Sequence, residues 1–212
     1  MIMPSPNFRH ISACSKQAYN GIRRPYQVLI AAFNLSLDNT PQIIHFFYED
    51  GEVENRLTDE DLREIFHFLT DVFPEEVEEE PDLVHILANL SEEPLTKVTF
   101  LFVYEQMLRL FEADNNRVRA MVMKALLKRL TTNDAYWLIL RLTRRANPFR
   151  RRDVIRALSA TFGISRGRIQ RESLFTTLPT IASRLLAKDE LVGLPKIGQP
   201  LLLPFPSKRF IP

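Results

Sequence analysis

Short helix-favouring segments, separated by prolines and capping residues, run along most of the chain and restrict it to a helical fold. The 212 residues include 14 prolines and only 6 glycines. Pro25 and Pro41 each stand where a first helical position is expected, a place at which the missing N–H costs nothing. Signals typical of strands are weak throughout. The sequence therefore predicts an all-α fold, a compact arrangement of many helices.

Apolar periodicity and capping residues place the individual helices. Thr58 to Asp61 form the pattern of a capping box, and Gly163 stands where a glycine ends a helix. We expect Asp114 and Thr132 to begin two further helices and Ser165 to begin a short turn. The predicted helices cover residues 25–35, 41–48, 58–69, 83–90, 96–113, 117–130, 135–145, 151–162 and 178–186.

Composition divides the chain into four stretches. Residues 1–23 lack clear periodicity and are expected to form a loose arm. Residues 24–93 are expected to form an acidic helical stretch, and residues 94–192 a basic one; these are either one unit or two lobes that meet near Pro94. Residues 193–212, with four prolines before Ser207, are expected to form an extended tail.

Charge is strongly segregated, although the net charge of the whole chain is only +2. Residues 49–93 carry 17 acidic and 2 basic residues, whereas residues 117–171 carry 15 basic and 2 acidic residues. Two solvated faces that attract each other would explain this pattern. The basic stretch is almost entirely arginine, however, which favours bidentate contact with phosphate. We therefore expect a nucleic-acid partner.

The arginines are densest around one predicted corner between helices, at Asn147 and Pro148. Cations gathered there repel each other unless an anion lies among them. Arginines before the corner could stabilise the end of a helix, but Arg150 to Arg152 would stand at a helix start, where positive charge is unfavourable. Further arginines follow Ser165, close to a helix start whose free amides also favour phosphate. The candidate DNA-binding residues are Arg117, Arg119, Lys128, Arg144, Arg145, Arg150, Arg151, Arg152, Arg156, Arg166, Arg168 and Arg171.

The sequence offers little for catalysis, cofactor binding or membrane insertion. It contains no glycine-rich phosphate loop, its four histidines are scattered, and Cys14 is its only cysteine. No apolar run is long enough to cross a bilayer. We expect no cofactor, no metal and no membrane partner, and an intracellular location, cytoplasmic or nuclear, because a lone thiol forms no internal disulfide.

The C-terminal half resembles the N-terminal DNA-binding domain of ATP-dependent DNA ligases. The residues from Asp114 to Leu142 resemble a pair of helices in that domain, and Val154 to Gly163 is similar to the helix that follows. Residues 177–186 resemble a later helix, and Gly198 to Pro204 resembles the strand that leads into the adenylation domain. The resemblance covers about residues 95–208 and rests on helix-packing patterns in a consistent order.

The chain also departs from the ligase pattern. The family usually has an arginine where Leu140 stands here, with Arg141 next, and an Arg-x-Gly corner where this chain has Asn147 to Arg150. None of its lysines begins the Lys-x-Asp-Gly motif whose lysine carries AMP in ligases. The resemblance thus implies duplex DNA binding around a nick or break, without catalysis by this chain alone.

These observations support two classes of function. The first is largely sequence-independent binding of double-stranded DNA in repair or replication, assisting a separate ligase catalytic chain or forming a piece of a longer ligase. The second is a helical adaptor that binds other proteins through opposed acidic and basic faces. A steep loss of duplex affinity with salt would distinguish the first class from the second.

Overall fold

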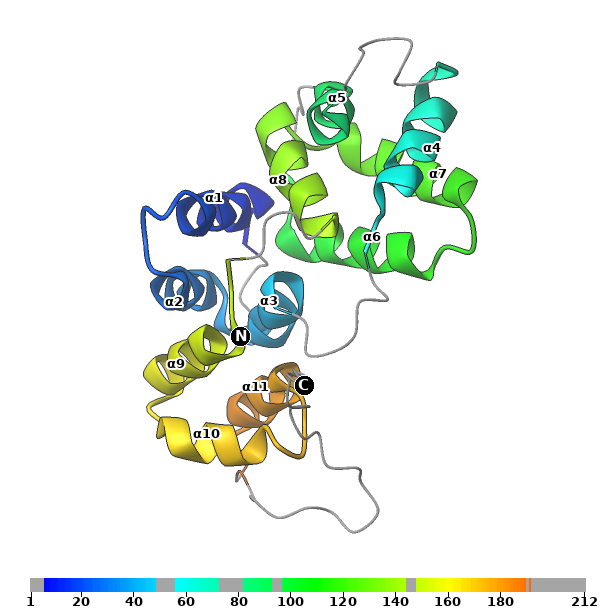
Figure 1. Ribbon diagram of the computed structural model, residues 1–212. Coiled ribbons are helices and arrows are strands. Elements are labelled where there is room, and N and C mark those ends of the chain that lie inside the picture. The colour runs from blue at the N-terminus through cyan, green and yellow to red at the C-terminus, as the bar shows by residue number, and fades with distance from the viewer. Residues whose placement is uncertain are drawn as a thin grey trace, which may run out of the picture.

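The computed structural model describes residues 6–48, 56–72, 82–92, 97–143, 148–189 and 191. Within these residues every named element is a helix, and the one β-interaction is an isolated bridge between Asn7 and Thr99. The all-α prediction is therefore confirmed for the described part of the chain. Figure 1 shows two groups of helices, one above the other, with α1 beside α8 and α3 below α6.

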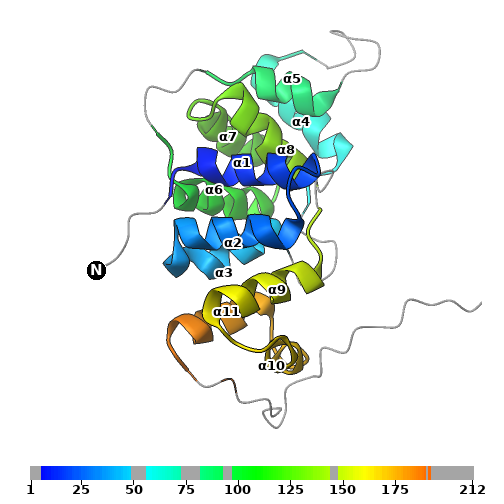
Figure 2. The ribbon, with the colours of Figure 1, turned by 90° about the vertical axis from the view of Figure 1, so that its left-hand side faces the viewer.

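The lower group combines helices from both ends of the described chain. Helix α2 packs against α9, and α3 packs against α11 (Figures 1 and 2). Helix α10 lies at the bottom of both views. The helices of this group are α1 (Phe8–Tyr19), α2 (Pro25–Leu35), α3 (Thr40–Phe47), α9 (Arg151–Phe162), α10 (Arg166–Glu172) and α11 (Leu178–Leu186), with a short 3-10 helix at Leu37–Asn39.

The upper group is made from the middle of the chain. Helix α4 packs against α7, α5 packs against α8, and α6 packs against α7. Helix α1 touches both α8 and α6, so it joins the two groups. The helices of this group are α4 (Asp59–Thr70), α5 (Leu83–Asn89), α6 (Phe100–Glu112), α7 (Asn116–Leu127) and α8 (Thr132–Leu142).

The prediction of a loose arm over residues 1–23 is wrong for the part that the structure describes, because α1 lies there. Phe8 and Ile11 are buried in the core, and the Phe8 backbone N–H donates to the Val98 carbonyl at 2.8 Å. Three of its five buried positions hold the small residues Ser12, Cys14 and Ala18, so the helix was missed because its mean hydropathy is low, although its buried side chains do follow the helix period.

The helices predicted at 25–35, 151–162 and 178–186 are confirmed at both ends, and those predicted at 41–48, 58–69 and 83–90 are confirmed to within one residue. The helices predicted at 96–113, 117–130 and 135–145 are found at Phe100–Glu112, Asn116–Leu127 and Thr132–Leu142, so their ends were placed less well. The short turn predicted after Ser165 is the helix α10. Pro25 begins α2, the Thr58–Asp61 capping box begins α4, and Gly163 ends α9 in a left-handed conformation. Helix α7 is capped by Asn115 instead of Asp114, and α8 by Thr131 instead of Thr132. In each pair of neighbours, the residue with extended backbone geometry holds the cap.

The two charge-segregated stretches do not pack as separate units. Helices α2 and α3 from residues 24–93 pack against α9 and α11 from residues 94–192, and α4 packs against α7 in the same way. All buried apolar side chains described belong to one continuous core. Pro94 and the predicted tail at 193–212 lie outside the described residues.

Candidate nucleic-acid interface

The ten candidate residues that the structure describes separate into two sets at opposite ends of the molecule. Arg117, Arg119 and Lys128 lie on α7 or at its end, in the upper group, whereas residues 150–171 lie on α9 and α10. Because Figure 2 is Figure 1 turned about the vertical axis, both views keep the same height, and both place α7 above and α9 and α10 below. Arg144 and Arg145 lie outside the described residues.

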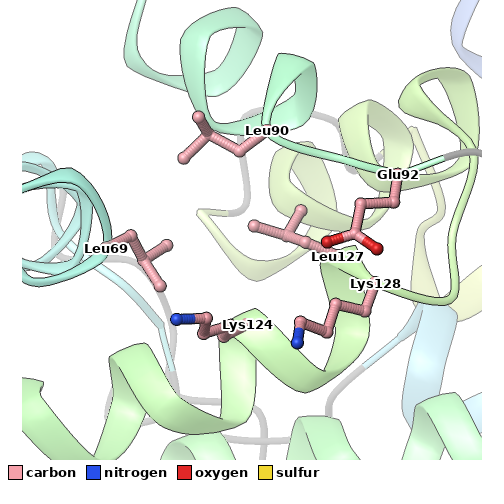
Figure 3. A pocket seen from close by; sticks show the side chains of 6 residues that line it. All are labelled: Leu69, Leu90, Glu92, Lys124, Leu127 and Lys128. Atoms are coloured by element: carbon pink, nitrogen blue, oxygen red, sulfur yellow. The ribbon is translucent and has the colours of Figure 1, made fainter.

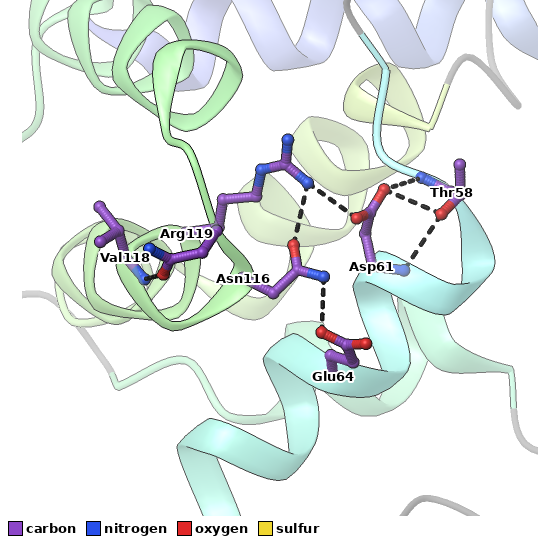
Figure 4. Close-up of polar contacts among 7 residues, drawn as sticks. Thr58, Asp61, Glu64, Asn116, Val118 and Arg119 are labelled. Carbon is purple, nitrogen blue, oxygen red and sulfur yellow. Dashed lines mark hydrogen bonds and ion pairs between the residues drawn. The ribbon is translucent and has the colours of Figure 1, made fainter.

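Arg119 is engaged within the protein, which removes it from the candidate surface. Its guanidinium donates to Asp61 Oδ1 at 2.7 Å and to Asn116 Oδ1 at 2.9 Å (Figure 4). Its side chain is 24% exposed. Burial acts to raise the pKa of Asp61, but hydrogen bonds from Thr58 and Asn116 and the charge of Arg119 outweigh it and lower that pKa. Arg119 therefore holds α7 against α4.

The corner before α9 presents its arginines in different ways. Arg150 is exposed, and its backbone N–H donates to Asp153 Oδ2 at 3.1 Å. Arg151 is half-buried and donates to the carbonyl of Ser173 at the end of α10, so it also joins two helices. Arg152 is exposed to solvent. The sequence could not reveal the contact of Arg151, because its acceptor is a backbone carbonyl 22 residues away.

The remaining arginines of α9 and α10 are all exposed. The Arg156 guanidinium lies over the Tyr26 ring of α2, 5.8 Å from its centroid, within the range of a cation–π contact. Arg168 donates to the Leu191 carbonyl at 3.1 Å. The exposed arginines of this region are therefore Arg150, Arg152, Arg156, Arg166, Arg168 and Arg171.

Acidic groups on α9 and α10 do not neutralise this surface. Between residues 150 and 172 the only acids are Asp153 and Glu172, which are 6% and 2% exposed. Asp153 caps the start of α9, and Glu172 accepts a hydrogen bond from Arg184 of α11. The six exposed arginines are therefore not neutralised by acids of their own two helices, and we call the exposed sides of α9 and α10 that carry them the α9–α10 arginine surface (Arg150, Arg152, Arg156, Arg166, Arg168 and Arg171).

Two more arginines lie near this surface and were missed from the sequence. Arg23 and Arg24 are exposed at the turn between α1 and α2, and Arg24 is the N-cap residue of α2. Figure 2 shows α2 and α9 beginning at the same side of the molecule. The available signal was Arg-Arg-Pro directly before a predicted helix, but it fell at the edge of the stretch that we expected to be a loose arm.

Of the two candidate cations that remain, Arg117 is exposed on α7 and Lys128 lines a small pocket in the upper group. The pocket lies between the end of α4, the segment that follows α5, and α7 (Figure 3). Its lining combines three leucines with one acidic and two basic side chains. The lining residues are Leu69, Leu90, Glu92, Lys124, Leu127 and Lys128.

Metal binding and membrane insertion find no support in the described ranges. Within them, no three His, Cys, Asp or Glu side chains come together in a way that could hold a metal ion. No helix in these ranges is both long enough and apolar enough to cross a membrane. The α9–α10 arginine surface is thus the strongest functional candidate in the described part of the chain.

No family model matches this chain, and no curated protein matches it either. Any functional assignment therefore depends on the arrangement of its own residues.

Proposed function

We propose that this chain binds double-stranded DNA through the α9–α10 arginine surface, largely without reading base sequence. The observation that carries the proposal is that six exposed arginines share two consecutive helices whose only acids are buried. Two exposed unit charges about 8 Å apart in water repel each other by about 0.5 kcal/mol. A polyanion replaces that repulsion with attraction and releases counterions from its phosphates.

Arginine is the side chain suited to this task. Its planar guanidinium binds phosphate oxygens in a bidentate manner, and phosphate contacts fix position on a duplex without specifying bases. The order of helix patterns that resembles ligase DNA-binding domains supports a role at nicks or breaks, in repair or replication. Since the chain lacks the Lys-x-Asp-Gly motif, we propose that it delivers DNA to a separate ligase catalytic chain or forms part of a longer ligase.

One observation favours the adaptor as a second candidate function. On α7, Met121 is 68% exposed and Val118 is 43% exposed. Arg117, Lys124 and Lys128, all exposed, belong to the same helix or its C-cap. Apolar side chains among cations are suited to an acidic protein partner with apolar residues of its own. This surface lies at the opposite end of the molecule from α9 and α10 (Figure 2), so the two functions can be tested separately.

The salt dependence of duplex binding tests the first proposal. Six phosphate contacts predict that log K falls with log salt with a slope near −5, a loss of roughly a thousandfold between about 50 and 200 mM salt. The triple variant R152A/R156A/R166A should reduce that slope by about 3 and weaken all duplexes alike. Arg151 stays unchanged in this variant because it joins α9 to α10.

The matched control removes the same charge from the other end of the molecule. R117A/K124A/K128A should leave the slope close to the wild-type value, because these cations lie on α7. Absence of wild-type binding at about 50 mM salt, or equal weakening by the two triple variants, would contradict a localised site on α9 and α10. Comparison of intact, nicked and single-stranded DNA then shows which form the surface prefers.

A further inference from the structure

The turn between α1 and α2 is an exposed but well-defined segment. All six residues from Tyr19 to Arg24 are exposed to solvent. Gly21 has a φ of 67°, a conformation that suits glycine. The backbone N–H groups of Ile22 and Arg23 both donate to the Gln17 carbonyl, at 3.0 and 3.3 Å. These bonds hold the turn on the end of α1, so Arg23 and Arg24 leave it from a fixed backbone.

Packing brings this turn to the same edge as the start of α9. Helices α2 and α9 lie against each other and begin at the same side of the molecule (Figure 2). The contact between Tyr26, in the first turn of α2, and Arg156 of α9 fixes their relation. Helix axes in contact are about 8–10 Å apart, so the side chains of Arg24 and Arg152 extend from neighbouring helix ends.

The start of α2 carries Arg23 and Arg24 and no acid in its first turn, whereas the start of α9 carries Arg150 to Arg152 around its one buried acid, Asp153. An arginine side chain has no acceptor for the first amides of a helix, and α2 has no side-chain cap. Positive charge at a helix start typically costs about 0.3–1 kcal/mol. No acidic partner within the described residues makes an ion pair with Arg23 or Arg24. An external anion would offset this cost at both helices.

We propose that Arg23 and Arg24 form a second row of phosphate contacts beside the α9–α10 arginine surface, so that one duplex backbone is held from two helices at once. This inference rests on the proposed function and extends it to a segment more than 120 residues away in sequence. Two rows on adjacent helix ends fix the direction of the bound backbone, which one row of flexible side chains does not.

The double variant R23A/R24A tests the second row. In the full chain, it should reduce the salt slope of duplex binding by about 2 and lower the affinity roughly tenfold or more at about 100 mM salt. R23K/R24K should retain most of the slope because it keeps the charge. Ile22→Ala, which changes the same turn without changing charge, should leave the slope at the wild-type value.

The control K97A/R109A removes two exposed cations outside both rows and should change binding little. Circular dichroism and the thermal midpoint establish that R23A/R24A remains folded. If the wild-type chain binds no duplex, the proposed function fails, and this inference fails with it. If R152A/R156A/R166A loses slope while R23A/R24A behaves like K97A/R109A, the proposed function stands and the second row alone is refuted.

Discussion

Arg141 is a buried arginine that contacts the end of α3. It is 5% exposed and donates through Nε to the Phe46 carbonyl and through a terminal nitrogen to the His45 carbonyl at 3.4 Å. These carbonyls belong to the last turn of α3, which lacks helical partners for them and carries partial negative charge. Arg141 therefore stabilises α3 from inside the protein and is not available to a ligand.

Replacing Arg141 should destabilise the fold through these carbonyls. Arg141→Met keeps an apolar stem but leaves two buried acceptors without their donor, so we expect unfolding to become easier by about 1–3 kcal/mol. Urea denaturation followed by circular dichroism measures the change. Arg109→Met, at an exposed arginine of α6, should shift the stability by less than about 0.5 kcal/mol. Equal stability of the two variants would refute this role.

Cys14 is the one thiol of the chain, and burial governs its ionisation. Desolvation raises the pKa of the thiol from 9.0 to about 11, with a smaller opposing effect from Arg23. The unfolded chain releases this proton near pH 9, whereas the folded chain holds it. The stabilisation is thus complete below pH 9 and is lost as the pH rises towards 11.

The free energy of unfolding should therefore fall between pH 8.5 and 10.5 more steeply in the wild type than in Cys14→Ala. The fall in the wild type should exceed the fall in Cys14→Ala by no more than about 3 kcal/mol. Comparing two proteins at the same pair of pH values cancels the titration of tyrosines and lysines, which both share. If the free energy of unfolding falls equally in the two proteins, the folded structure does not raise the pKa of Cys14.

Helices α9 and α10 each have a glycine, and replacing these two glycines by alanine should change the stability in opposite directions. Gly163 ends α9 with a φ of 68°, whereas Gly167 lies inside α10, and a Cβ at either position would meet nothing within 4 Å. Gly163→Ala should cost about 1 kcal/mol because of its left-handed backbone. Gly167→Ala should gain about 0.5–1 kcal/mol because alanine favours a helix. Thermal midpoints that move in the same direction would contradict this account.

Local signals in the sequence sufficed where a helix carries its own boundaries. The start of α4 was predictable from Thr58 and Asp61, and the end of α9 from Gly163, because these caps act within a few residues. Helix α1 was not predictable, because small side chains such as Ser12 and Cys14 occupy its buried face. Its burial depends on contacts with α2, α6 and α8 that a local pattern does not contain.

The candidate surface was predictable in composition but only partly in membership. The density of arginine around residues 150–171 was plain in the sequence. Whether a particular guanidinium faces solvent depended on distant partners: Asp61 for Arg119 and the Ser173 carbonyl for Arg151. Arg23 and Arg24 lie near this surface only because α2 packs on α9. The charge of a segment can thus be read from the sequence, whereas the exposure of each charged side chain to solvent depends on the fold.

At the scale of the whole molecule, aromatic packing joins the two groups of helices. Phe46 of α3 makes edge-on contacts with Phe8 of α1, at a centroid distance of 6.0 Å, and with Phe100 of α6, at 5.6 Å. All three rings are at most 1% exposed. Since the lower group itself combines residues 8–47 with residues 151–186, neither half of the sequence can complete its core alone. We therefore expect the described helices to unfold as one cooperative unit.

Trp137, the single tryptophan, lies on α8 of the upper group and contacts Tyr19 of α1. Its fluorescence and the far-ultraviolet circular dichroism should give superimposable unfolding curves. Leu158→Ala tests the coupling more strictly, because Leu158 is fully buried in α9 of the lower group. The cavity should cost about 2–5 kcal/mol and lower the midpoint seen at Trp137 by the same amount as the midpoint seen by circular dichroism. The two groups unfold independently if the fluorescence of Trp137 keeps its wild-type midpoint in this variant. In that case, part of the circular dichroism signal would be lost at a lower denaturant concentration or temperature.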